Sequence, residues 1–283
     1  MQQQAFFMVD YSNPQPPEGI NSSNDNPIKE LVILGLGILA VLTLLFFVVS
    51  WSAGWLATKI PFRYEQQVGD EIFVNSSEFA ASASLQDLAD RLAPHMQLDE
   101  EIQISAHFSD DDTINAFAFL GGHVVMYDGL IQRLESENAL AMVMAHEMAH
   151  VKHRDVARSL GRGIALALVS SVLFGDSDGL AARIVGTGFH AGMLSFSREQ
   201  ERAADEAAIA AVNALYGHTD GALQLYEVLE AEQQEGLLRG VEFFNTHPHT
   251  ESRIEELQSI IDHSTWHQRG TLTPLRLKTD SDS

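Results

Sequence analysis

The longest apolar stretch of the chain covers residues 31–58, which contain no charged residue. A helix needs about 20 apolar residues to cross the core of a bilayer, so this stretch is long enough to span with some tilt. A cleaved signal peptide is the alternative, but the stretch begins late and exceeds a typical signal core. The pattern therefore predicts a single-pass membrane protein that contacts lipid through residues 31–58. Residues 1–30 are rich in Asn, Gln, Ser and Pro, and we expect them to form a disordered polar leader.

Helical spacing appears in several segments beyond residue 61. Ser136 provides an N-cap for a helix that runs through the sequence AMVMAHEMAHVKHRD. Ser252 and Glu255 fit a capping box at the start of another. The apolar segment 164–174 is too short to cross a bilayer alone, so we expect a helix that is buried or touches the membrane. The remaining predicted helices cover 84–98, with Leu85, Leu88 and Leu92 on one face, 197–215, and 250–261, with Ile254, Leu257 and Ile261 on one face.

Two short runs between these helices, 102–108 and 113–130, are typical of strands. Gly121 and Gly122 lie between apolar residues of the second run and predict a hairpin turn. Many helices with few strands define an α+β fold, and we expect one mostly helical domain with a small sheet over residues 61–265. The end of the chain, 266–283, is expected to form a loosely ordered tail.

Composition limits the chemistry that the chain can perform. The chain has no cysteine, so a metal site must use His, Asp or Glu. Its 17 basic and 39 acidic residues give a formal net charge of −22, which argues against a nucleic-acid partner, since such a partner requires a basic surface. Apolar residues make up 45% of the chain and are spread along it, so the acidic charge does not indicate disorder.

The sequence HEMAH places three ionisable side chains in an apolar helix. Residues four apart lie one turn above each other, so His146 and His150 can direct two imidazole nitrogens to one metal ion. Glu147 then sits beside the metal, where it can take a proton from a water molecule that the metal activates. This is the H-E-x-x-H arrangement of zinc peptidases. Two histidines on the surface of a helix are the alternative interpretation.

A catalytic zinc site needs three protein ligands and an open position. The longer motif, in which Gly and a third His follow, does not fit, because those positions are His153 and Val156. A third ligand must therefore come from a later segment. The sequence SREQERAAD offers Glu201, with Asp205 one turn further on the same face, as a ligand and as a residue that orients a ligating imidazole. A solvated acidic helix face is the alternative for this pair.

Three separated motifs, HEMAH, SFSREQERAAD and THPHTESRIEEL, occur in the order found in a known family. Together with NAFAFLGGHVVMYDGLI, they resemble the gluzincin metallopeptidases that include the CAAX prenyl endopeptidase and HtpX (peptidase family M48), from about Glu65 to Leu257. The resemblance implies a zincin-like fold with one Zn²⁺ per chain, with Glu147 as general base and Asp205 as the acid that follows the third ligand. It also implies zinc ligation by His146, His150 and Glu201, and stabilisation of the oxyanion by His247 and Arg253.

The single predicted span distinguishes the chain from the CAAX enzymes and HtpX, which have several spans, and a prenyl-peptide substrate is therefore disfavoured. We hypothesise a membrane-anchored endopeptidase that cleaves internal bonds of misfolded membrane or envelope proteins. The strand at 123–127 would receive the peptide as an added strand, with substrate contacts at Asn115, Ala116, Phe117, Gly122 and His123. The alternatives are an anchored zinc-binding scaffold or chaperone with little proteolysis, and a zinc hydrolase of non-peptide substrates.

Overall fold

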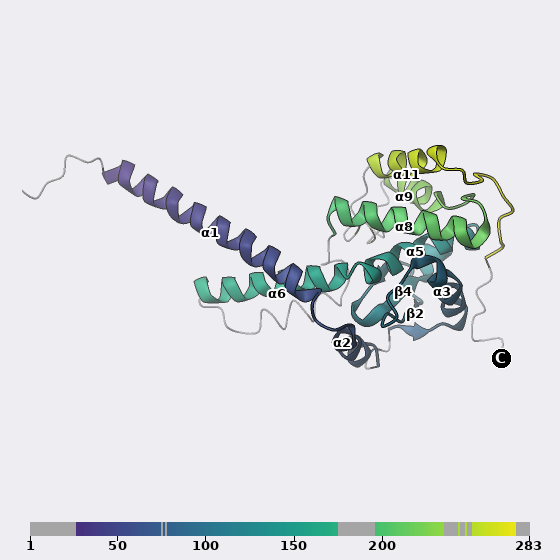
Figure 1. Cartoon of the computed structure of the whole chain (residues 1–283), viewed down its shortest axis with the longest axis horizontal. Helices are drawn as coiled ribbons and strands as arrows, with labels where there is room; N and C mark the ends of the chain where they lie inside the picture. Colours follow the sequence, from purple (N-terminus) through teal and green to yellow (C-terminus); the bar gives the residue numbers. More distant parts are fainter. Residues whose placement is uncertain are drawn as a thin grey trace, which may run out of the picture. The chain divides into compact units, whose positions relative to one another are not determined.

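The computed structural model describes residues 27–74, 76, 78–174, 196–234, 243, 247 and 251–275, except for the side chains at 166–174, 232–234 and 251. The chain divides into two compact units, Met1–Phe46 and Phe47–Ser283. The second unit carries the sheet and all the candidate site residues, and Figure 1 shows how its helices surround the sheet.

Helix α1 (Pro27–Ala57) contains the predicted span, and among the described residues it is the one helix long and apolar enough to cross a membrane. It begins four residues earlier than the sequence pattern indicates, so residues 27–30 are helical and do not belong to a disordered leader. Proline is favoured in the first turn of a helix because its fixed φ suits the helix and its missing N–H is not needed there. Residues 1–26 of the predicted leader lie outside the described residues.

A helix that the sequence pattern does not single out, α2 (Phe62–Val74), packs on the short 3₁₀ turn η1 (Leu120–Gly122). The contact is close because Gly69 has no side chain: a Cβ there would lie 2.2 Å from the carbonyl oxygen of Leu120. Glu65 of α2 forms a partly buried ion pair with Arg154, which follows the helix that carries HEMAH. The helix therefore joins the segment after α1 to the centre of the domain.

The sheet has four strands in the order β1-β2-β4-β3. Strand β2 (Ser105–Ser109) runs parallel to β4 (His123–Tyr127), while β1 (Ala80–Ala81) and β3 (Ala116–Ala118) are antiparallel to their neighbours. The predicted hairpin is confirmed: β3 and β4 are joined through Gly121 and Gly122, whose φ values of 79° and 87° favour glycine. Strand β4 has a neighbouring strand on each side, so it cannot receive a peptide as an added strand, contrary to the expectation from the sequence. Strand β3 lies at the edge of the sheet.

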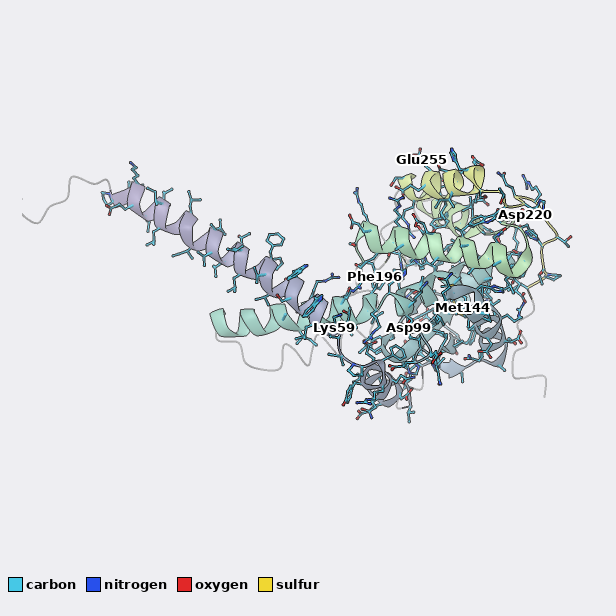
Figure 2. All side chains as sticks on the ribbon, viewed as in Figure 1. Lys59, Asp99, Met144, Phe196, Asp220 and Glu255 are labelled. Atoms are coloured by element: carbon cyan, nitrogen blue, oxygen red, sulfur yellow. The ribbon has the colours of Figure 1, made fainter. Side chains whose placement is uncertain are left out.

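The helical layer is built around α5 (Glu137–Lys152), in which every residue from Asn138 to Val151 is buried. Ser136 caps this helix as predicted, since its Oγ accepts from the N–H of Ala139 at 3.2 Å. Figure 1 shows α8 (Arg198–Tyr216) lying along α5, with α9 (Gln224–Gln234) and α11 (Glu251–His263) nearby. Met144 of α5, labelled in Figure 2, lies fully buried in the middle of this layer. The remaining helices are α3 (Ala83–Met96), α4 (Asp128–Ile131) and α6 (Asp155–Phe174).

The predicted helix at 84–98 is confirmed as α3, and Leu85, Leu88 and Leu92 of its apolar face are buried. The apolar segment 164–174 is the second half of α6; its burial or membrane contact stays a prediction, because its side chains from 166 onward lie outside the description.

Two predictions about the end of the chain are wrong. Helix α11 already includes Glu251, so Ser252 lies within the helix and is not its N-cap. Residues 266–275 are not a loose tail, because the N–H of Glu137 donates to the carbonyl oxygen of Thr273 at 2.9 Å and the N–H of Thr219 donates to that of His267 at 2.9 Å. The first N–H groups of a helix lack partners within it, and here the tail supplies one for α5.

Candidate metal centre

Helix α5 brings the three ionisable residues of HEMAH into the interior. His146, Glu147 and His150 are at most 1% exposed. Because the two histidines are one turn apart, their Nε2 atoms face each other at 3.2 Å. Burial of unpartnered ionisable groups is costly, so their convergence at one point requires a compensating charge or ligand. The surface-histidine interpretation is therefore wrong for this helix.

Glu201 reaches the same point from the first turn of α8. Its Oε2 lies 3.5 Å from Nε2 of His146, and its Oε1 lies 3.5 Å from Nε2 of His150. The turn is fixed by a capping box in which Ser197 and Gln200 satisfy each other's backbone N–H groups. Glu201 is 1% exposed, so the solvated-face alternative does not hold for it.

His247 is a fourth member of the cluster. Its Nδ1 lies 3.0 Å from Oε1 of Glu201 and 3.2 Å from Nε2 of His146, and its ring stacks on Phe243 at 4.4 Å. Potential ligand atoms of His146, His150, Glu201 and His247 all lie within 4.8 Å of one another. The sequence motifs assign His247 to the oxyanion and give no sign that it lies at ligand distance from the other three.

The spacing of these atoms fits a metal ion. Tetrahedral zinc with ligand distances of about 2.0–2.2 Å places neighbouring ligand atoms about 3.3–3.6 Å apart. The separations between the two imidazole nitrogens and the Glu201 oxygens, 3.2 Å and 3.5 Å, agree with this value. Burial lowers the pKa of His146, but Asp205 and Glu201 outweigh it and raise the pKa to about 10, so the surroundings favour a positive charge here.

Two carboxylates hold the outer nitrogens of the imidazoles. Oδ1 of Asp205 lies 2.9 Å from Nδ1 of His146, and Oδ2 of Asp155 lies 2.9 Å from Nδ1 of His150. Gln200 donates to the other oxygen of Asp155 at 2.7 Å. Carboxylates in this position orient a ligating imidazole and increase its basicity. Asp155 ends the stretch HEMAHVKHRD, but its spacing from His150 is not helical, so the sequence pattern gives it no role.

Arg253 of α11 contacts two carboxylates of α8. Its Nη1 lies 2.7 Å from Oε2 of Glu201, and its Nε and Nη2 donate to the two oxygens of Asp205, each at 2.8 Å. Tyr226 of α9 donates to Asp205 at 2.5 Å. Burial raises the pKa of Asp205, but His146 and Arg253 outweigh it and bring the value to about 2. The guanidinium thus contacts the acids of the site, which differs from the predicted contact with an oxyanion.

Phe196 completes the wall of the cluster from the segment before α8 (Figure 2). Its ring stacks on that of His150 with a centroid distance of 4.0 Å, and it is 5% exposed. An aromatic wall restricts the access of water to one side of the imidazoles, which strengthens electrostatic interactions at the site.

The expected substrate residues separate into two groups. His123 is buried under α2, where it hydrogen bonds to Asp70 at 3.1 Å and stacks on Phe73 at 4.2 Å. A Cβ on Gly122 would lie 1.9 Å from the carbonyl oxygen of Gln103. Both residues are packed in the interior of the domain, which does not favour the expected contact with substrate. Asn115, Ala116 and Phe117 lie in or next to the edge strand β3.

The outer side of β3, which faces away from β4, can be identified from the hydrogen bonds between the two strands. Phe119 donates to the carbonyl oxygen of His123 at 2.7 Å, and Tyr127 donates to that of Asn115 at 3.2 Å. Backbone groups alternate in direction along a strand, so those of Ala116 and Ala118 point away from β4. Just before β3, the N–H of Phe243 donates to the carbonyl oxygen of Ile114 at 3.3 Å, which places the start of this edge next to the segment that carries His247.

A buried H-E-x-x-H helix, a glutamate from a later helix and a small mixed sheet are the features of a zincin-type metallopeptidase. Residues 80–261, more than half of the chain, match the model of Peptidase family M48, and the chain belongs to this family. The resemblance seen in the sequence motifs is thereby confirmed, as is the assignment of the chain to the metallopeptidases, a class of hydrolases that implies a bound metal.

Curated relatives come from bacteria and from eukaryotes. The chain is 33% identical over 161 residues to the Beta-barrel assembly-enhancing protease of Escherichia coli (strain K12), covering 53% of this chain and 33% of the relative. It is 31% identical over 162 residues to the Mitochondrial metalloendopeptidase OMA1 of Schizosaccharomyces pombe, covering 56% of this chain and 47% of the relative. The chain thus spans about a third of the first relative and about half of the second.

Proposed function

We propose that this protein is a membrane-anchored zinc endopeptidase in which His146, His150 and Glu201 bind one Zn²⁺ per chain. The observation that carries the proposal is the mutual spacing of 3.2–3.5 Å between their Nε2 and Oε atoms in a buried site. Imidazole and carboxylate ligands in a chain without cysteine suit zinc. Asp205 and Asp155 would hold the two imidazoles in the ligating orientation.

Glu147 is the proposed general base. Its two carboxylate oxygens are buried and have no hydrogen-bond partner among the described residues, and Oε1 lies 3.3 Å from Nε2 of His247. Zinc held by these residues would supply a Lewis acid for the scissile carbonyl and would lower the pKa of a water molecule. Glu147 takes the proton of this water and passes it to the leaving amine.

His247 and Arg253 receive different roles. Burial lowers the pKa of His247, so the neutral ring can donate one N–H to the developing oxyanion. Arg253 is already engaged by Glu201 and Asp205, and we assign it to the positioning of these two carboxylates. This assignment replaces the oxyanion role that the sequence motifs imply for Arg253.

The proposed substrate is an extended polypeptide that pairs with the outer side of β3. Ala116 is 0% and Ala118 3% exposed, so this side must be uncovered before a substrate can bind. Backbone groups of Ala116 and Ala118 point to this side, and pairing through the backbone accepts many sequences. Such tolerance suits the removal of misfolded membrane or envelope proteins. Relatives named for β-barrel assembly and for mitochondria support a role at membranes, and α1 would provide the anchor through residues 31–57.

Metal content and cleavage, measured together on the full chain, test the proposal. Wild type should contain one zinc per chain and cleave an unfolded protein, with activity lost to a chelator and restored by zinc. His150→Ala should lose both zinc and activity. His153→Ala is the matched control, because His153 follows the same helix but lies outside the cluster. Full zinc content in His150→Ala would contradict the ligand assignment, and zinc binding without cleavage would favour the scaffold alternative.

A further inference from the structure

A cavity of about 250 Å³ lies between the last turns of α1 and the first turns of α6. Its walls include the indole rings of Trp51 and Trp55 and the side chains of Arg158 and Arg162. Every lining residue belongs to the unit Phe47–Ser283. None of its lining residues is a proposed metal ligand, and the proposed peptidase reaction leaves the cavity without a function.

Close packing of small residues fixes the two walls. A Cβ on Gly161 would lie 3.0 Å from Cβ of Ala57 and 3.1 Å from the carbonyl oxygen of Ala53. A Cβ on Gly54 would lie 3.6 Å from Cγ of Arg162. Because the helices approach closely here, the aromatic rings and the arginines of the cavity are held in a defined arrangement.

The polar groups of the cavity have hydrogen-bonding capacity to spare. Arg162 donates to Oγ of Ser159 at 2.8 Å, and Arg158 donates to Oδ1 of Asp155 at 3.3 Å. Each guanidinium carries five N–H groups in a fork that matches the oxygens of a phosphate. The hydroxyl of Ser50, which also lines the cavity, is buried and has no hydrogen-bond partner among the described residues.

Basic residues gather around the cavity, and two of them are paired: Arg154 with Glu65 and Arg158 with Asp155. The chain carries a formal charge of −22 and only 17 basic residues, yet five of these surround the junction of α1, α2 and α6: Lys59, Arg63, Arg154, Arg158 and Arg162. Lys59, labelled in Figure 2 at the end of α1, lies with its Nζ 5.5 Å from the ring of Trp55. Basic side chains beside an apolar helix attract anionic lipids, and tryptophan favours the level of the headgroups.

We propose that this cavity binds the phosphate group of an anionic membrane lipid. Arg162 and Arg158 would hold the phosphate oxygens, Ser50 would donate its hydroxyl, and the two indole rings would pack against the glycerol and the upper acyl chain. The inference rests on the proposed membrane anchorage, but not on the peptidase chemistry. The cavity would give the membrane anchor a specific lipid-binding site, in addition to the apolar surface of α1.

Fluorescence of Trp51 and Trp55 provides the test. Trp266 is the third tryptophan of the chain and is replaced in a Trp266→Phe background. The full chain is placed in phosphatidylcholine nanodiscs that contain a minor fraction of brominated phosphatidylglycerol or, in parallel, of brominated phosphatidylcholine. Bromine quenches nearby indoles, so the ratio of the two quenching signals measures the enrichment of the anionic lipid at the cavity.

The key variant is Arg162→Gln, because Arg158 also contacts Asp155 and with it the metal centre. We expect this variant to lower the enrichment about tenfold, the effect of losing a hydrogen bond between two charged groups, and to lower it more than a variant that removes surface charge alone. Arg63→Gln is the matched control: it removes the same charge from the same region, but Arg63 stacks on Tyr64 and does not line the cavity. An unchanged melting temperature of both variants shows that they are folded.

Three results would overturn the proposal. Equal loss of enrichment in Arg162→Gln and Arg63→Gln would indicate surface charge without a site. Inorganic phosphate that shifts the fluorescence in pure phosphatidylcholine discs and abolishes the enrichment would assign the cavity to a soluble phosphate compound. A protein that is folded and cleaves substrate but does not enter the discs would refute the anchorage, and the lipid site with it, while leaving the peptidase function intact.

Discussion

Oε2 of Glu201 lies 2.7 Å from Nη1 of Arg253, across the contact between α8 and α11. Both side chains are buried, and the same guanidinium binds Asp205 with two further nitrogens. One arginine therefore fixes the carboxylate that is proposed to bind zinc and the carboxylate that holds His146. Position and charge of the metal centre depend on a residue that is not itself a ligand.

Arg253→Ala should consequently destabilise the domain and weaken metal binding. Removing one partner of a buried ion pair costs about 3–5 kcal/mol, and loss of an outer partner lowers metal affinity about 10–100-fold. Thermal unfolding and competition with a chelator measure the two effects. Arg202→Ala is the control, because Arg202 is 63% exposed on α8 and its ion pairs lie at the surface. Wild-type metal affinity with a reduced kcat would instead restore the oxyanion role of Arg253.

Asp155→Asn tests the support of the second imidazole. The carboxylate accepts from Nδ1 of His150 at 2.9 Å, whereas an amide can present its NH₂ group to this nitrogen and favour the wrong tautomer. We expect zinc affinity to fall about 10–100-fold. Asp87→Asn, on the exposed face of α3, should leave the affinity unchanged. Equal affinities of Asp155→Asn and wild type would show that Asp155 serves the packing of α5 against α6 only.

Peptide binding to the edge of β3 can be tested on the substrate itself. N-methylation removes one backbone donor at a time, and in an antiparallel pair only alternate residues donate to the neighbouring strand. We expect every second N-methyl group near the cleavage site to lower kcat/KM by about 2- to 10-fold, the effect of one hydrogen bond. Losses without this alternation would argue against strand addition.

Stability should depend on pH through His107. Its Nε2 lies 2.8 Å from Nδ1 of His123, and burial together with the charge of His123 lowers the pKa of His107 from 6.5 to about 4. Between these values His107 binds a proton in the unfolded chain but not in the folded chain. Its contribution to the free energy of unfolding is therefore complete above pH 6.5 and is lost as the pH falls towards 4. Melting temperatures across this window should show a weaker dependence for His107→Gln. An unchanged dependence would mean that other groups cause the acid sensitivity.

Local signals in the sequence predict local structure well. Ser136 caps α5, helical spacing brings His146 and His150 together, and Gly121 and Gly122 form the turn of the hairpin. Contacts between segments that are far apart in the sequence are harder to predict from it. Strand order is not encoded in any one strand, so the interior position of β4 and the edge position of β3 appear only in the assembled sheet.

In the candidate site, too, local relationships are predicted from the sequence and long-range contacts are not. The motifs place His146, His150 and Glu201 correctly in one cluster, because two of them share a helix and the third lies in a recognisable segment. The approach of His247 and the engagement of Arg253 depend on how α8 and α11 pack. A formally charged residue near a catalytic motif is read from the sequence as a group that acts on substrate, although its partner can equally be another side chain of the protein.

The most direct test of the proposed chemistry is single-turnover cleavage of an unfolded protein by wild type and Glu147→Gln, both containing one zinc per chain. Glu147 is buried beside the cluster and is not among the four groups that converge as potential ligands. The variant should therefore keep its zinc and cleave about 10²–10⁴-fold more slowly, the contribution of a general base. Equal cleavage rates at equal zinc content would contradict the proposed role of Glu147 and the peptidase mechanism built on it.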